Sequence, residues 1–156
     1  MILEFLEEKM MPFAAKIANQ RHLAAIKDGI IVTLPFIIAG SVFLILANLP
    51  IPAITKFYLT DTGQIIQKWL SYPVGVTFDL IAVITCLGIA YRLSESYKLD
   101  GISGAILGLV SFLLVTPFVI NFTHEKFGQL TAAGIPTSLT GSSGLFVAII
   151  MAILST

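Results

Sequence analysis

Two long runs of uncharged, mostly apolar residues constrain this chain more than any other feature. Residues 29–49 make up 21 positions and residues 101–120 make up 20, and neither run contains Asp, Glu, Lys or Arg. A helix needs about 20 apolar residues to cross the hydrocarbon layer of a membrane, because each residue adds about 1.5 Å of rise. Both runs therefore predict membrane-spanning helices.

Two further stretches extend this pattern. Residues 69–91 carry a single charge, Asp79, and predict another span near residues 72–92. After Lys126 the chain is uncharged, and its last apolar run predicts a fourth span near residues 139–156, which the end of the chain truncates. The predicted fold is all-α: a polytopic membrane protein with about four transmembrane helices, preceded by an amphipathic helix.

The composition supports a membrane protein and excludes several other classes. Hydrophobic residues make up 56% of the chain and charged residues 12%, whereas soluble domains have about 25% charged residues. Nine basic and nine acidic residues balance, so there is no basic surface typical of nucleic-acid binding. The single cysteine, Cys86, excludes a disulfide framework and a cysteine-rich zinc site. We expect no cofactor, no metal and no nucleic-acid partner.

The first 28 residues form a region of a different kind. Apolar residues recur there at helical spacing, which places them on one face: Leu3, Leu6, Met10, Phe13 and Ile17. Such a helix can lie in the membrane interface, or it can pack on its own protein or on a neighbouring subunit. Pro12 should bend it. We therefore divide the chain into an interfacial region, residues 1–28, and a transmembrane domain, residues 29–156.

The basic residues predict the orientation. Six lie before the first span or in the polar link at residues 92–100, namely Lys9, Lys16, Arg21, Lys27, Arg92 and Lys98. Three lie on the other side: Lys56, Lys68 and Lys126. Because Lys and Arg are enriched in cytoplasmic loops, the N-terminus is predicted to be cytoplasmic. The short link also predicts that the spans on either side of it are antiparallel neighbours.

Few residues are candidates for chemistry. Asp79 either is a coupling or substrate-contacting group inside the membrane, or it lies near the outer interface because the helix begins near Phe78; we favour the second interpretation. His124 and Glu125 lie in a loop, where a solvated or capping role is expected. Cys86 is interpreted as a packing residue. No known catalytic or metal-binding motif is present, so catalytic and metal-ligating residues are predicted to be absent.

Small residues mark one face of the predicted helix at residues 101–120. Gly104 and Gly108 form a GxxxG motif, and Gly101, Ala105 and Ser111 extend the face. Such faces let helix backbones approach closely. The face can pack within the chain or build a dimer, and the sequence leaves both alternatives open.

Several long stretches carry a resemblance to a known family. They are NQRHLAAIKDGIIVTLPFIIAGSVFLIL (Asn19–Leu46), TFDLIAVITCLGIAYRLSESYKLDGISG (Thr77–Gly104), LVSFLLVTP (Leu109–Pro117) and GSSGLFVAIIMAIL (Gly141–Leu154). Together they resemble the membrane-spanning IIC permease subunits of bacterial sugar phosphotransferase systems, in the lactose/cellobiose/diacetylchitobiose group. The resemblance covers almost the whole chain.

This resemblance implies a function. Family members are dimers of a ten-span subunit, whose first half builds the dimer interface and whose second half holds the sugar. A cytoplasmic IIB subunit, phosphorylated by IIA, phosphorylates the incoming sugar. The chain would then be a fragment, the N-terminal part of a permease for a β-linked disaccharide such as cellobiose, in the bacterial cell membrane. It would be a homodimer through this half and no enzyme by itself.

The same resemblance implies that no sugar-binding residue lies in this segment. The sugar-site residues of the family should lie beyond residue 156, and neither His124 nor Cys86 matches a residue of that site. Two alternatives to a permease part remain: a small four-span pore, and a membrane scaffold that does not transport.

Overall fold

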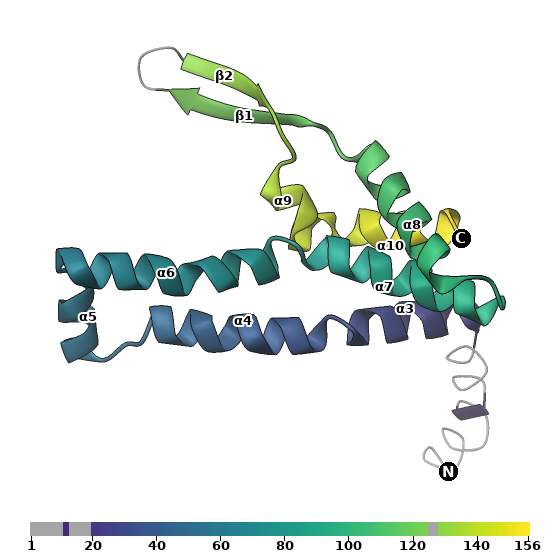
Figure 1. Ribbon diagram of the computed structural model, residues 1–156, viewed down its shortest axis with the longest axis horizontal. Helices are drawn as coiled ribbons and strands as arrows, with labels where there is room; N and C mark the ends of the chain where they lie inside the picture. The colour runs from purple at the N-terminus through teal and green to yellow at the C-terminus, as the bar shows by residue number, and fades with distance from the viewer. Residues whose placement is uncertain (1–10, 13–19, 125–127) are drawn as a thin grey trace, which may run out of the picture.

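The computed structural model describes residues 11–12, 20–124 and 128–156, which are mostly helical (Figure 1). The amphipathic helix predicted from Leu3, Leu6, Met10, Phe13 and Ile17 lies outside the described residues, as does Glu125. Helices α3 (Arg21–Ile31) and α4 (Leu34–Ala47) follow one another as one long arm. A short helix, α5 (Pro52–Tyr58), turns the chain, and α6 (Asp61–Phe78) and α7 (Ile81–Ser96) form the returning arm.

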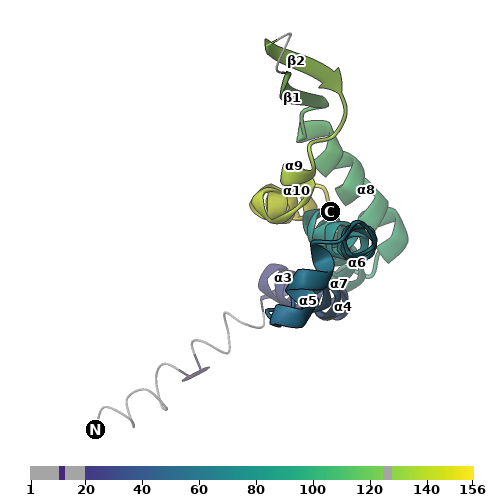
Figure 2. The same ribbon diagram turned by 90° about the vertical axis from the view of Figure 1, so that its left-hand side faces the viewer.

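The two arms pack side by side and antiparallel, with α3 against α7 and α4 against α6 (Figure 1). Helices α8 (Gly101–Val115) and α10 (Leu145–Leu154) lie on the other side of α7. The turned view shows the α6–α7 arm between α3–α4 and the later helices (Figure 2). Helix α7 is therefore the centre of the fold, and the predicted antiparallel packing of the spans around residues 92–100 is confirmed.

Local sequence features explain where these helices begin. Pro35 occupies the first turn of α4, where its missing N–H costs nothing. The Thr33 hydroxyl donates to the Ile30 carbonyl (2.6 Å) at the joint between α3 and α4. At the start of α6, Thr60 is the N-cap, and its hydroxyl accepts from the Gly63 N–H (3.2 Å). The returning arm thus begins with a capped helix at Asp61, before the start of the span predicted near residues 72–92.

Helix α6 corrects one expectation about the returning arm. It includes Tyr72, Pro73 and Gly75, so the interpretation that the helix begins near Phe78 is wrong. Proline is tolerated inside α6, where the Thr77 hydroxyl donates to the Pro73 carbonyl (2.7 Å). The chain leaves regular helix only at residues 79–80, before α7.

Small side chains dominate the buried core around α7. One cluster of buried residues comprises Ala82, Cys86, Ile89, Ala90, Phe112, Ala148 and Ala152, from α7, α8 and α10. Cys86 is completely buried, and its thiol donates to the Gly108 carbonyl (3.4 Å). The interpretation of Cys86 as a packing residue is confirmed.

A two-stranded hairpin corrects the all-α expectation. Strands β1 (Val119–His124) and β2 (Gly128–Ala133) pair antiparallel, with Val119 opposite Ala133 and His124 opposite Gly128. Pro117 explains the change, because the residue before a proline avoids helical geometry and Thr116 is extended (φ −78°, ψ 124°). The last residues of the predicted 101–120 span are therefore not helical. After the hairpin, α9 (Thr137–Thr140) and the 3₁₀ turn η2 (Ser142–Gly144) lead into α10.

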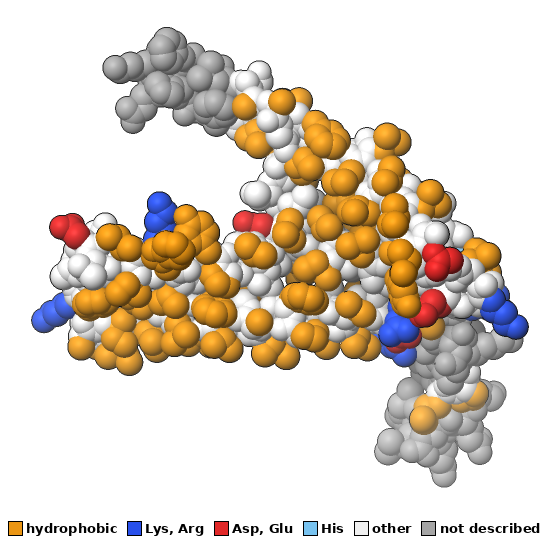
Figure 3. Space-filling view, viewed as in Figure 1, with side chains coloured by type: hydrophobic (Ala, Val, Ile, Leu, Met, Phe, Trp, Pro, Cys, Tyr) orange, Lys and Arg blue, Asp and Glu red, His pale blue; other side chains and the backbone are white. Residues whose placement is uncertain are grey.

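Two helical segments are long and apolar enough to cross a membrane, judged by length and composition: residues 21–47 and 61–96. Helix α8 and residues 142–154 are shorter apolar helices. The two antiparallel arms, α3–α4 and α6–α7, form a long helical hairpin. Hydrophobic side chains cover the length of this long hairpin, whereas charged side chains gather mostly towards its two ends (Figure 3). Such a surface suits an apolar surrounding better than water.

Asp100 caps α8 and gives a pH-dependent prediction. Its carboxylate accepts from the Ser103 N–H (2.7 Å), and hydrogen bonds from Ser103 lower the pKa of this carboxyl. A lowered pKa in the folded state stabilises the fold above the unfolded-state pKa, and this contribution is lost as the pH falls through the folded-state value. We expect Asp100→Ala to unfold at a lower temperature than the unchanged protein at pH 7, with a smaller difference at strongly acidic pH. A difference that stays constant over this pH range would contradict the assignment.

Candidate functional site

The joint between α6 and α7, at residues 79–80, carries a charged side chain within a stretch that is otherwise uncharged. Asp79 follows the last residue of α6, and its N–H donates to the Gly75 carbonyl (2.8 Å). Leu80 then leaves helical geometry (φ −111°, ψ 8°) before α7 begins. The Asp79 side chain is exposed. A carboxylate thus stands at a break in a helical arm that is otherwise apolar in this region.

Contacts between the arms show where Asp79 lies along the first uncharged run. A Cβ on Gly40, the twelfth residue of that run, would lie 2.8 Å from the Thr77 Cβ. Near one end of the run, a Cβ on Gly29 would meet Ile89; near the other, the Gln67 amide donates to the Ala47 carbonyl (2.9 Å). Asp79, two residues after Thr77, is therefore level with the middle of the run. This level favours the alternative interpretation, a carboxylate inside the membrane, and the depth of Asp79 in a bilayer stays a prediction.

This depth makes Asp79 the leading functional candidate among the described residues. An ionised carboxylate at the middle of a membrane-spanning helix costs about 2.5–3.5 kcal/mol unless it is paired or hydrated. A carboxylate can accept several hydrogen bonds or pair with a cationic side chain. The exposed position of Asp79 leaves its oxygens accessible to such a group.

The segment that follows the β1–β2 hairpin lies against the joint between α6 and α7. A Cβ on Gly141 would be 3.1 Å from the Phe78 carbonyl oxygen and 3.4 Å from the Asp79 Cα. The stretch at residues 134–144, rich in helix-breaking residues, thus forms α9 and η2 and packs a glycine against the break. The break is consequently held between α4 and the α9–η2 turn.

We predict that a probe at Asp79 reports the middle of the bilayer. A nitroxide attached to Asp79→Cys, in a Cys86→Ala background, should be relaxed strongly by oxygen and weakly by a water-soluble nickel complex. The matched control is Tyr97→Cys, at the polar end of α7, where the nickel complex should dominate. Equal nickel accessibility at the two positions would contradict the mid-membrane placement.

Other features expected of a reaction site are absent from the described part of the chain. No group of three or more His, Cys, Asp or Glu side chains that could hold a metal occurs among the described residues. A pocket of about 550 Å³ lies at the base of the hairpin, and the residues that line it, among them Pro117, Ile120 and Thr137, include no ionisable side chain.

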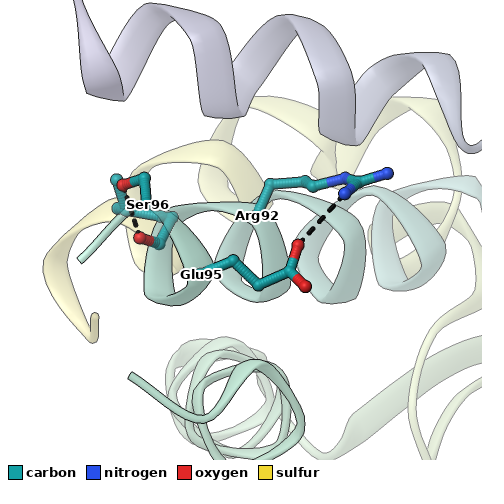
Figure 4. Close-up of polar contacts among 4 residues, drawn as sticks. Arg92, Glu95 and Ser96 are labelled. Carbon is teal, nitrogen blue, oxygen red and sulfur yellow. Dashed lines mark hydrogen bonds and ion pairs between the residues drawn. The ribbon is translucent and has the colours of Figure 1, made fainter. Parts of the chain in front are cut away.

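Polar side chains cluster where α3 begins and α7 ends. The Tyr97 hydroxyl lies 3.4 Å from His22 Nε2, and the Arg21 guanidinium lies 5.2 Å from the centroid of the Tyr97 ring. On α7, Arg92 and Glu95 point toward each other and form an ion pair (3.0 Å), with Ser96 nearby (Figure 4). The contacts of Tyr97 with His22 and Arg21 join residues far apart in the sequence, and no local pattern indicates them, whereas Arg92 and Glu95 are a local i,i+3 pair on one helix.

The described basic residues of the two helical arms lie toward the two ends of these arms, as the predicted orientation requires. Arg21 and Lys27 on α3 share one end with Arg92 on α7, while Lys56 on α5 lies at the opposite end. Lys27 forms an exposed ion pair with the neighbouring Asp28 (3.3 Å). Which end faces the cytoplasm remains a prediction.

The small-residue face of α8 packs within the chain. A Cβ on Gly104 would lie 2.7 Å from the Ser94 Cβ, and a Cβ on Gly108 would lie 2.6 Å from the Ala90 Cβ. Gly101 likewise abuts the Tyr91 ring. Of the two alternatives for this face, the structure therefore supports packing against α7. Ala105, by contrast, lines an open groove beside α7.

Comparisons with known proteins agree with this architecture. A putative permease IIC component (YwbA) of Bacillus subtilis is 50% identical over 153 residues, which is 97% of this chain and 34% of that protein. The lichenan permease IIC component of B. subtilis is 47% identical, over 98% of this chain and 34% of that protein. The cellobiose-specific EIIC component of Geobacillus stearothermophilus is also 47% identical, over 99% of this chain and 35% of that protein.

A solved structure is similar as well. The crystal structure of ChbC, the IIC component of an N,N'-diacetylchitobiose-specific phosphotransferase system, superposes with a TM-score of 0.87 at 47% identity, covering 96% of this chain and 35% of that one. The chain thus spans about a third of the length of the curated relatives. Residues 27–156 match the family described as "Phosphotransferase system, EIIC". The chain belongs to the phosphotransferase system EIIC family.

Proposed function

We propose that this chain is the N-terminal part of a permease that carries a β-linked disaccharide such as cellobiose across the bacterial cell membrane. The observation that carries the proposal is its 47% identity, over 99% of its length, to a cellobiose-specific EIIC component. Identity falls to 28% for a lactose-specific EIICB component of Staphylococcus epidermidis. The gradient favours a sugar of the cellobiose or chitobiose type over lactose.

Transport and phosphorylation are divided between subunits in this proposal. EIIC components are the membrane permease subunits of phosphotransferase systems, so the chain is located in the cell membrane. The phosphoryl group comes from a partner IIB subunit, which IIA phosphorylates. The N-terminus and the end that carries Arg21 and Arg92 face the cytoplasm, where these partners bind.

The described helices act as the scaffold of the permease. Helix α7 packs against α3, α8 and α10 through small residues, which is the arrangement of a rigid support. The residues that line the pocket at the base of the β1–β2 hairpin carry no ionisable side chain. We place the sugar-holding residues outside residues 1–156. Two copies associate through this half, and the sugar-holding part moves against the paired scaffolds in alternating access.

Uptake of labelled sugar tests the function. Cells that lack their own β-glucoside permeases and express the complete permease with its IIA and IIB partners should accumulate labelled cellobiose as its phosphate. Unlabelled N,N'-diacetylchitobiose should compete, and maltose, the α-linked control, should not. Accumulation that persists without IIB, or competition by maltose equal to that by cellobiose, would overturn the proposal. Ion leakage without sugar phosphorylation would instead support a pore.

A further inference from the structure

An apolar groove with an arginine at one end lies beside the core of the fold. It has a volume of about 500 Å³ and is bounded by the α3–α4 arm, α7 and α8. The residues that line it include Val32, Phe36, Ile84, Leu87 and Ala105, and Tyr91 and Arg92 close its polar end. None of these residues belongs to the Asp79 joint.

Two small residues keep this groove open. A Cβ on Gly88 would lie 2.8 Å from the Gly29 carbonyl oxygen, so α3 and α7 are in backbone contact at this point. Gly88 has no side chain and Ala105 has only a methyl group, so neither fills the space above the contact. The larger side chains of Phe36 and Leu87 form the walls.

The polar end of the groove lies just outside the uncharged run. Gly29, where the run begins, contacts Ile89, and the His22–Tyr97 contact lies further out. Arg92, between these two contacts, is therefore level with the boundary between apolar and charged residues, which is the depth of lipid headgroups. Ile84 and Arg92 are eight positions apart on α7, which corresponds to about 12 Å along the helix.

The guanidinium of Arg92 contacts two neighbouring side chains and has further N–H groups that can donate hydrogen bonds. Its Nη1 lies 3.0 Å from Glu95 Oε2, and its Cζ lies 5.9 Å from the centroid of the Tyr91 ring. The side chain is 48% exposed. A guanidinium has five N–H donors in a planar fork that matches a phosphate group, so a second partner can bind beside Glu95.

We propose that this groove binds an anionic phospholipid, with its phosphate at Arg92 and an acyl chain along Gly88, Leu87 and Ile84 toward Phe36. The charge of Arg92 complements the phosphate, and the lining beyond it offers only apolar contacts to a chain. An anionic phospholipid carries a phosphate and an acyl chain in one molecule. Its phosphate lies at the headgroup depth, where Arg92 lies, and its acyl chain extends into the apolar layer, as the groove does. The bound lipid would fill the space between the two arms and α8 and stabilise their packing.

Lipid binding to the protein purified from membranes tests this site. Native mass spectrometry should show phosphatidylglycerol bound about fivefold more tightly than phosphatidylcholine with the same acyl chains, the equivalent of about 1 kcal/mol for one cation. Arg92→Gln should remove this preference and Arg92→Lys should keep most of it. Ala105→Leu, which fills the groove, should weaken binding of both lipids. The matched control, Lys56→Gln at the far end of the hairpin, should change neither.

Several outcomes would overturn the proposal. The first is equal binding of the two lipids by the unchanged protein, and the second is unchanged binding by Ala105→Leu. Stabilisation by inorganic phosphate equal to that by phosphatidylglycerol would mean that the site takes a soluble anion. Efficient disulfide cross-linking between two copies through Leu87→Cys, without retained lipid, would mean that a second copy covers the groove. Size-exclusion elution identical to that of the unchanged protein qualifies each variant as folded.

Discussion

The Gly29→Ala variant should lose the contact between α3 and α7 and much of the stability of the fold. A Cβ at this position would lie 2.5 Å from the backbone nitrogen of Ile89 and 2.7 Å from its Cα. These are backbone atoms of a buried residue, so no side-chain rotation can relieve the overlap. Overpacking usually costs about 1–3 kcal/mol, and a backbone clash belongs at or above the upper end of that range.

Gly75→Ala is the matched control for this variant. Gly75 also lies within a helix of the long hairpin, but a Cβ there would meet only Asp79 Oδ2, at an ordinary 3.5 Å. Alanine is favoured over glycine inside a helix by about 1 kcal/mol, so this variant should be as stable as the unchanged protein or more so. Thermal unfolding in detergent measures both. Equal unfolding temperatures for Gly29→Ala and Gly75→Ala would contradict the backbone contact.

The Gly104→Leu variant should separate α8 from α7. A Cβ at Gly104 would lie 2.7 Å from the Ser94 Cβ and 3.3 Å from the Ala90 carbonyl oxygen, and leucine adds three more carbons. We expect a loss of about 3 kcal/mol or more, because the α7 side of the contact is itself buried. The lone thiol of the chain provides the readout, since Cys86 is buried against Gly108 on the same pair of helices.

Intact mass after treatment with a maleimide shows whether Cys86 has become accessible. The thiol should be unreactive in the folded unchanged protein and should react in Gly104→Leu. Leu114→Ala is the control, because Leu114 is on the same helix but 82% exposed. In this variant the Cys86 thiol should stay protected. An unreactive thiol in Gly104→Leu, together with a changed oligomer size, would instead assign the glycine face to a contact between subunits.

Features that depend on local sequence could be predicted. The uncharged runs at 29–49 and 101–120 contain the whole of α4 and of α8, because hydrophobicity is a property of each short segment. The family could also be identified, since long stretches of its sequence are present. Cys86 was predicted to pack, because a cysteine among apolar residues has no partner for chemistry.

Features that depend on distant contacts could not be predicted. Tyr72, Pro73 and Gly75 suggest a helix break, yet α6 continues through them and packs along α4. The level of Asp79 along the first uncharged run follows from the contact between Gly40 and Thr77, which are 37 positions apart in the sequence. Tertiary packing overrides local preference in both cases.

The hairpin illustrates a different difficulty. Its strands form at the edge of an apolar run that is long enough for a membrane span, so length alone favours helix over strand. The signal against helix was Pro117, which restricts Thr116 to extended geometry. The two strands also have to pair in one register, with Val119 opposite Ala133, and this register is seen only in the folded structure.

In the proposed function, residues 20–124 and 128–156 form the scaffold of a permease whose sugar is held elsewhere. A photoreactive cellobiose derivative, bound to the complete permease and activated by light, tests it most directly. Peptide mapping should locate the attached sugar outside residues 1–156, with labelling abolished by excess cellobiose. Competable labelling of the Asp79 joint or of the pocket at the base of the hairpin would contradict the claim and assign sugar binding to this segment.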